Sequence, residues 1–347
     1  SRRLPDATYL SIPLTNQRYL NTRFHPYVMS WYSLKSTRIS NELATVLTGV
    51  EFDCVVTVAH GVGWLTAAKI ADSKRLPLHL AVHDDWPRVA NVPGVFRKWV
   101  NESFGRVYRQ ATSRMCVSPT MRARYLEQHG CDSHVVYPTR GANCVDVDGE
   151  IRRKDQPFTI AFAGTINSQG YVQALVKLRD ALKAVNGKLA LFGPLTRAEA
   201  MANQLAGPNV TLHGLVNPAE LLKRLREEAD ALFVPMSFSP SDRWNMEMAF
   251  PSKLADYTAV GLPLLIYGPD YCSAVRWSRD NQGVAEIVEN EDSELLMAAI
   301  RRLANDPDYR VTLGERALDI GQQYFAYGVA QQIFTDVLCK VASVEDL

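Results

Sequence analysis

Short apolar runs alternate with longer amphipathic segments along the chain of 347 residues. The apolar runs are rich in valine, leucine and alanine, which is typical of strands buried on both faces of a parallel sheet. The segments between them place apolar residues at helical spacing. In the first half of the chain we predict strands at residues 7–13, 52–59, 78–82, 114–118 and 134–137. The helices predicted for this half are residues 37–48, 64–73, 96–110 and 119–129.

A polar stretch interrupts the alternation near the middle of the chain. Residues 141–156 have neither a helical nor a strand period, and we predict a linker between two domains there. The alternation resumes with strands at residues 158–163, 188–192, 210–213, 231–235, 264–267 and 284–288. The helices predicted for this half are residues 172–185, 197–205, 218–228, 252–260, 293–305 and 307–324. The pattern predicts an α/β protein with two Rossmann-like domains, at residues 1–140 and 157–325.

The composition is that of a reduced globular protein. Hydrophobic residues make up 47% of the chain, which is sufficient for two cores, and the net charge of +1 gives no overall field for nucleic acid. The six cysteines are scattered without a Cys-x-x-Cys pair, which favours a cytoplasmic protein over a disulfide framework or a zinc site. We see no signal peptide and no apolar run long enough for a transmembrane segment. The chain begins at Ser1, so we expect that a segment could have been removed upstream.

Residues 250–266 form the most informative motif of the chain. Pro251 suits a first helical turn, Gly261 suits a helix end, and an apolar strand follows. Ser252 and Lys253 stand at the predicted helix start, where a phosphate could be bound, and Asp256 one turn later could accept hydrogen bonds from a ribose. This pattern resembles the sugar-nucleotide site of GT-B glycosyltransferases, above all glycosyltransferase family 4. An ordinary surface helix with a proline start and a glycine end is the alternative.

The resemblance implies a fold and a reaction. It implies two Rossmann-like domains that face each other across a deep cleft, with the segment 326–347 packing back on the first domain. The implied reaction moves a sugar from a nucleotide-diphosphate donor to a hydroxyl acceptor (a glycan, a glycolipid or a small molecule), with retention of configuration and without metal or cofactor. Lys253 and the amides of Ser252 and Leu254 would neutralise the departing diphosphate, and Asp256 would hold the ribose.

The loop after the first strand of the second domain is the next part of the expected donor site. Gly164 lets a ligand approach the backbone, and the amides around Gly164 and Thr165 could bind the diphosphate or the sugar. Family 4 proteins often carry an arginine and a lysine in this loop, whereas this chain has Thr165 and Gln169. The departure moves the expected phosphate contacts onto Lys253 and Arg243.

Two further donor contacts are implied by the resemblance. The backbone near Val216 would recognise the nucleotide base. Family 4 has an acidic pair separated by seven residues, whose second member aligns with Asp256 and whose first member falls at Met248, next to Glu247. We therefore assign the orientation of the donor sugar to Glu247, with Arg243 beside it in the sugar pocket. An exposed loop glutamate is the alternative.

The acceptor is expected on the first domain, at the loops that follow two strands. His83, Asp84 and Asp85 come after the strand at 78–82, where family 4 often has a His-Asp pair, and His83 would face the reacting sugar. His60 and Gly61 follow the strand at 52–59 and would leave room for an acceptor. A capping cluster at a strand end is the alternative for the aspartates. The basic helix at 96–110 leaves open a peripheral contact with the inner face of a membrane.

Three rival functions remain at this level. The shifted acidic pair, and the lack of the glycine-rich loop that family members carry near the N-terminus, fit a non-catalytic sugar-nucleotide-binding partner subunit. A GT-B-type sugar-nucleotide epimerase would use the same donor without an acceptor. A nicotinamide oxidoreductase is disfavoured, because the segment after His60 lacks the third glycine of a dinucleotide fingerprint.

Overall fold

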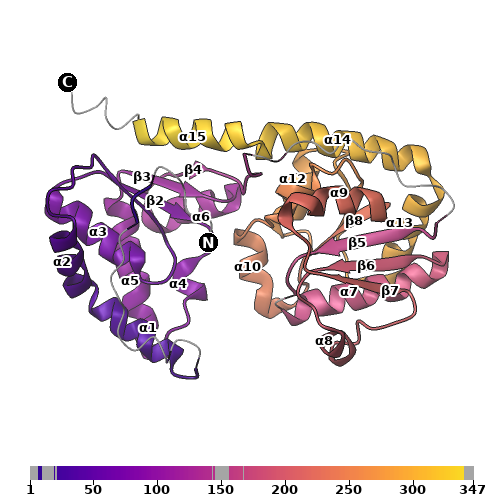
Figure 1. The fold of residues 1–347 in the computed structure, drawn as a ribbon, viewed down its shortest axis with the longest axis horizontal. Helices are drawn as coiled ribbons and strands as arrows, with labels where there is room; N and C mark the ends of the chain where they lie inside the picture. The colour runs from indigo at the N-terminus through magenta and orange to yellow at the C-terminus, as the bar shows by residue number, and fades with distance from the viewer. Residues whose placement is uncertain are drawn as a thin grey trace. The chain divides into compact units, whose positions relative to one another are not determined.

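The computed structural model describes residues 7–9, 19, 22–142, 144, 156–166 and 168–339. The chain divides into two compact units (Figure 1), a first unit of Ser1–Val135 with Thr335–Leu347 and a second unit of Val136–Phe334. Each unit is built on its own parallel sheet, which confirms the predicted α/β class with two Rossmann-like domains.

The first unit is built around four parallel strands in the spatial order β1-β2-β3-β4. The strands are β1 (Val55–Val58), β2 (Leu78–Val82), β3 (Ser113–Cys116) and β4 (His134–Val135). Its helices are α1 (His25–Leu34), α2 (Ser36–Val46), α3 (Gly63–Lys74), α4 (Trp86–Val89), α5 (Gly94–Gln110) and α6 (Pro119–His129). Helix α6 begins where the Ser118 hydroxyl accepts a hydrogen bond from the Met121 amide, and it ends at Gly130, whose φ is +70°.

The second unit contains six parallel strands in the order β10-β9-β8-β5-β6-β7. They are β5 (Thr159–Ala163), β6 (Lys188–Phe192), β7 (Val210–Gly214), β8 (Ala231–Pro235), β9 (Leu264–Tyr267) and β10 (Ala285–Val288). The helices between them are α7 (Gln169–Leu182), α8 (Arg197–Ala202), α9 (Pro218–Glu228), α10 (Arg243–Met248), α11 (Lys253–Tyr257), α12 (Ser273–Asp280) and α13 (Ser293–Asn305). The short 3₁₀ turns are Lys183–Val185 and Pro240–Asp242. Every residue of β5, β8 and β9 is buried, since helices cover both faces of the sheet.

The chain ends with two long helices, α14 (Pro307–Phe325) and α15 (Tyr327–Cys339). Residues from Thr335 onward group with the first unit, and Val337 of α15 is buried. None of the helices in the described part of the chain is long and apolar enough to cross a membrane.

Two predicted segments fall largely outside the described residues. Of the strand predicted at 7–13, only residues 7–9 are described, and they have no regular secondary structure. Of the linker predicted at 141–156, only residues 141, 142, 144 and 156 are described. The domain limits at 1–140 and 157–325 stay predictions, and Val136–Phe334 group as the second unit.

Candidate functional site

The carboxyl edge of the six-stranded sheet has a topological switch point at β5. Strand β5 lies between β6, which follows it in the chain, and β8, which is reached only after β6 and β7. Open parallel sheets bind ligands outside the carboxyl ends of their strands at such a point. The residues that follow β5 and β8, and the helices that lie against them, are therefore the first place to look for a site.

Two glycines allow the backbone segments after β5 and β6 to lie close together at this edge. The φ angle is +139° at Gly164, after β5, and +151° at Gly193, after β6, a region that favours glycine. The Gly164 amide donates a hydrogen bond to the carbonyl of Phe192 (2.8 Å), and a Cβ on Gly193 would overlap the Gly164 carbonyl oxygen. A Cβ on Gly164 would lie 2.6 Å from Cε and 3.1 Å from Nζ of Lys253. The lysine therefore fills the space that a side chain at Gly164 would occupy.

Helix α11 carries Lys253 and is fixed to the end of β5. Tyr257, one turn after Lys253, is fully buried; its hydroxyl accepts from the Ala163 amide (2.6 Å) and donates to the Ala163 carbonyl (3.2 Å). Arg140 is buried and donates from Nε to the Ala255 carbonyl (3.0 Å) and from a terminal nitrogen to the Thr258 hydroxyl (3.0 Å). The two side chains fix the C-terminal half of this short helix to the core, and this sets the position of Lys253 against Gly164.

The Lys253 ammonium has no hydrogen bond or ion pair with any residue in the described ranges. Its nearest aromatic neighbours are the rings of Phe162 and Tyr171, whose centroids lie 5.1 Å and 5.8 Å from Nζ. Burial lowers the pKa of Lys253 from its usual value, because the charged form loses water. An uncompensated cation at the switch point is suited to a negatively charged ligand.

The remaining residues of the motif differ in whether their polar groups are free to bind a ligand. The Leu254 side chain is fully buried and its amide donates to the Pro251 carbonyl (3.1 Å), so the amide that we expected to bind phosphate is already occupied. Ser252 is exposed, and its hydroxyl does not cap α11. The Asp256 side chain is exposed at the same helix. Its assignment to ribose stays a prediction.

Glu247 and Arg243, which we assigned to the sugar pocket, form an ion pair on α10. Arg243 Nε lies 2.9 Å from the Glu247 carboxylate, which is buried, whereas the Arg243 side chain is mostly exposed. The Arg243 guanidinium also lies over the Tyr271 ring, 4.5 Å from its centroid. The alternative, an exposed glutamate in a loop, is therefore wrong, because Glu247 is buried and lies in a helix.

The two remaining donor residues are positioned at strand ends. Thr165 is exposed directly after Gly164, and Val216 is half-buried in the loop after β7. Between these loops the rings of Phe192 and His213 are stacked, with centroids 4.2 Å apart. Contact of Val216 with a base stays a prediction.

The loop after β2 in the first unit holds the expected acceptor residues. His83 is exposed and Asp84 is half-buried. Asp85 is buried at the start of α4, and its carboxylate accepts a hydrogen bond from the Tyr125 hydroxyl (2.9 Å). Asp85 thus has a structural partner, whereas His83 is open to solvent.

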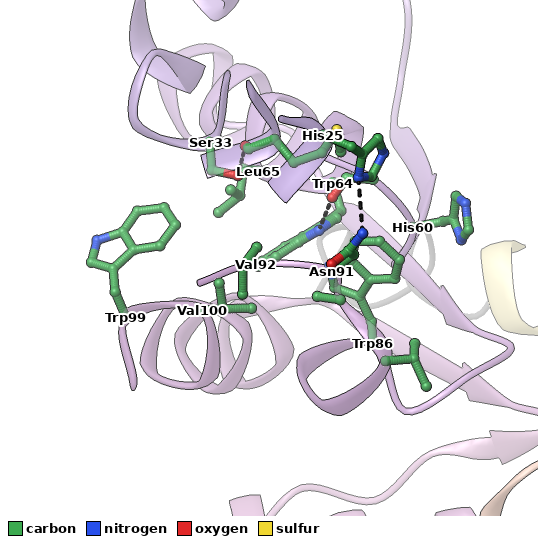
Figure 2. A pocket seen from close by; sticks show the side chains of 14 residues that line it. His25, Ser33, His60, Trp64, Leu65, Trp86, Asn91, Val92, Trp99 and Val100 are labelled. Atoms are coloured by element: carbon green, nitrogen blue, oxygen red, sulfur yellow. Dashed lines mark hydrogen bonds between the residues drawn. The ribbon is translucent and has the colours of Figure 1, made fainter. Parts of the chain in front are cut away.

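A pocket of about 250 Å³ lies at the carboxyl ends of β1 and β2 in the first unit (Figure 2). His60 and Gly61, both predicted to contact the acceptor, line it. The His60 ring lies against the Trp86 ring, with centroids 4.8 Å apart, so the loops after β1 and β2 meet at this pocket. Within the described ranges, no three His, Cys, Asp or Glu side chains are grouped as metal ligands would be.

Several residues at these sites were not predicted from the sequence. Arg140 is the last residue of the predicted first domain, and no local pattern shows that it reaches α11. Tyr257 lies inside the predicted motif, four residues after Lys253. This spacing places both residues on one face of the helix and could have indicated that Tyr257 lies near the site. The aromatic lining of the first-unit pocket comes from four separate segments, which no local pattern could bring together.

Comparisons with known proteins, in sequence and in structure, both point to glycosyltransferases. The profile of Glycosyltransferase Family 4 matches residues 3–141. HepE from Anabaena, in complex with UDP, superimposes with a TM-score of 0.65 at 14% identity, over 87% of this chain and 82% of HepE. Sucrose-phosphate synthase from Thermosynechococcus elongatus gives 0.66 at 13% identity, over 90% and 79%. A glycosyltransferase from Rickettsia africae gives 0.61 at 16% identity, over 92% and 83%.

A search among curated proteins finds no match. At these identities the solved structures establish the fold, and the family profile adds a match in sequence over the first 141 residues. The predicted resemblance is confirmed: the profile of Glycosyltransferase Family 4 matches residues 3–141, and the solved structures show that the chain has the same fold as these glycosyltransferases.

Proposed function

We propose that the protein transfers a sugar from a nucleoside diphosphate sugar to a hydroxyl group of an acceptor, with retention of configuration. The observation that carries the proposal is the position of Lys253, a cation without a hydrogen-bond partner among the described residues, held against Gly164 at the switch point. Negative charge builds up on the leaving diphosphate as the bond to the sugar breaks. A preorganised ammonium stabilises that charge without having to reorganise.

The other residues have supporting roles in the proposal. Asp256, on the same helix, holds the ribose, and the backbone near Val216 contacts the base. Glu247 orients the donor sugar and is itself kept in place by Arg243. His83 contacts the reacting sugar in this proposal. The reaction needs no metal ion in this proposal, because Lys253 supplies the positive charge.

The first experiment is thermal denaturation with UDP-, GDP-, ADP-, CMP- and dTDP-linked sugars. HepE, which shares the fold, has been determined with UDP and with UDP-glucose, so UDP-sugars are the first donors to test. We expect one nucleotide class to raise the melting temperature with concentration. In the presence of that donor we expect Lys253→Ala to abolish transfer while the protein stays folded. Undiminished turnover by this variant would refute the assigned role.

One observation favours a second candidate, a sugar-nucleotide-binding partner subunit without activity. The Glu247 carboxylate is buried and engaged by Arg243, one residue away from the position expected in family 4. Such a subunit would show the nucleotide-dependent thermal shift but release no nucleotide in the presence of water or any acceptor. The two candidates therefore separate on turnover. We further propose a cytoplasmic location, with six free cysteines as its support.

A further inference from the structure

The pocket of the first unit has a distinct chemical lining. Three tryptophans, Trp64, Trp86 and Trp99, come from α3, α4 and α5 and form much of its wall. Figure 2 shows Trp99 at one end and His60 at the other, with Trp64 and Trp86 between them. The indole nitrogen of Trp64 is buried and donates to the Gly61 carbonyl (3.1 Å), so this ring is held rigidly. Trp64 is only 1% exposed and belongs to the rigid base of the wall, whereas the half-buried Trp86 and Trp99 leave aromatic surface open to an occupant.

Among the described lining residues, only His25 and His60 have ionisable side chains. The other members of the lining are aromatic, aliphatic, small or polar, and no Asp, Glu, Lys or Arg among the described residues takes part. A charged group would lose its water in this pocket without a carboxylate, a lysine or an arginine to pair with. The volume of about 250 Å³ is below the usual range of pockets for drug-sized ligands, so the space suits a single ring-sized group. The occupant is therefore small and uncharged.

A polar pair gives one side of the pocket its hydrogen-bonding capacity. The Asn91 amide nitrogen and His25 Nδ1 are 3.2 Å apart, and the hydrogen bond between them joins α1 to the segment before α5 (Figure 2). The amide nitrogen of Asn91 can only donate, so His25 Nδ1 accepts, and the second N–H and the carbonyl oxygen of Asn91 remain as a donor and an acceptor for a third partner. This is the requirement of a hydroxyl group, which donates and accepts at once.

We infer that this pocket binds one uncharged pyranose ring of the acceptor. The inference rests on the proposed function, which supplies the need for an acceptor. A pyranose has apolar faces of C–H groups that lie well on aromatic rings, and hydroxyls at its edge that suit the His25–Asn91 pair. An alkyl chain would cover the tryptophans but make no hydrogen bond to that pair. The site lies at the carboxyl ends of β1 and β2, where an α/β sheet binds its ligand.

Saturation-transfer NMR tests the inference without requiring turnover. The probes are methyl β-D-glucopyranoside, methyl β-D-galactopyranoside, methyl α-D-mannopyranoside, propyl β-D-glucopyranoside and the charged methyl β-D-glucuronide. We expect transfer to the ring protons of at least one neutral glycoside and none to the glucuronide. Trp86→Ala should weaken binding about tenfold. His25→Ala should weaken it as well, and it leaves the tryptophans in place should Trp86→Ala fail to fold.

The matched control is Trp31→Ala, which removes a half-buried tryptophan from α1 that does not line the pocket. Equal losses in Trp31→Ala and Trp86→Ala, equal binding of the glucuronide, transfer only to the propyl chain, or no transfer to any glycoside would overturn the inference. The nucleotide-sugar thermal shift, measured on the same samples, separates the two proposals. A normal shift without glycoside binding refutes the pyranose pocket alone, whereas a flat nucleotide panel refutes the proposed function.

Discussion

Replacing Lys253 by methionine should stabilise the protein without nucleotide and abolish most of the stabilisation that nucleotide gives. Methionine keeps the length of the side chain and its contact with the Phe162 and Tyr171 rings, but removes the partly buried charge. The lowered pKa of Lys253 reports the cost of that burial. The two effects have opposite signs, which a merely structural lysine would not produce.

The surroundings of Lys253 Nζ determine the expected changes in the free energy of unfolding and in the stabilisation by nucleotide. A buried polar group without a hydrogen bond costs about 1–3 kcal/mol, and contact with aromatic rings returns about 0.5–1 kcal/mol. Because Lys253 is only partly buried, we expect a net gain of about 1 kcal/mol in the free energy of unfolding, or roughly 2–4 °C. A nucleotide at about 100 times its Kd stabilises the wild type by about 2.7 kcal/mol. Loss of a charged hydrogen bond weakens binding by about 100-fold, which leaves about 0.4 kcal/mol.

Differential scanning fluorimetry with and without the nucleotide identified in the panel measures both quantities. Lys223→Met is the control, since the Lys223 side chain is 73% exposed and lies on the same unit. The control should keep both the melting temperature and the nucleotide shift. A Lys253→Met protein that is less stable than wild type, or that keeps the full nucleotide shift, would refute the assignment of Lys253 to the phosphate.

Two further predictions concern the two units separately. Gly193→Ala should lower the free energy of unfolding by about 3 kcal/mol or more in urea titrations, because the new Cβ meets the Gly164 carbonyl. Gly214→Ala, where φ is +69° and nothing lies within 4 Å, should cost only about 1 kcal/mol, and equal losses would contradict this account. Burial, with a smaller effect of Arg109, lowers the pKa of His129 from 6.5 to about 4, so the folded first unit binds fewer protons. Its stability should fall by up to about 3 kcal/mol between pH 6.5 and 4; a His129→Phe protein with an equally steep pH dependence would disprove this.

The sequence predicted the central strands of the second unit well. The strands at 188–192, 231–235 and 264–267 have the predicted bounds, because strands buried on both faces are continuous apolar runs between polar loops. Four helices were not predicted, namely α1, α4, α10 and α12. Helix α4 has only four residues, and α1 mixes aromatic and small residues around its circumference. Such segments show no period of 3.6, because their burial depends on neighbours distant in the chain.

The site was predictable where one local motif carries the chemistry. Lys253 and Gly164 were both singled out because each follows a recognisable turn signal, and the parallel topology brings them to the same edge. Their contact was not predictable, because it depends on Tyr257 reaching β5 across 94 residues of sequence. The His25–Asn91 pair spans 66 residues, and neither residue belongs to a motif. Long-range pairs leave no periodic trace in one sequence.

The features that lower the stability of the second unit are concentrated at the switch point. Gly164 and Gly193 adopt φ angles that other residues avoid, and Lys253 buries a charge that the described residues leave without a hydrogen bond. None of these features improves the packing of the sheet, since an alternative with ordinary loops and an apolar side chain would be more stable. Destabilising features that the fold does not require are expected where they contribute to binding. Their coincidence at the switch point is the physical argument for the proposal that this edge binds the donor.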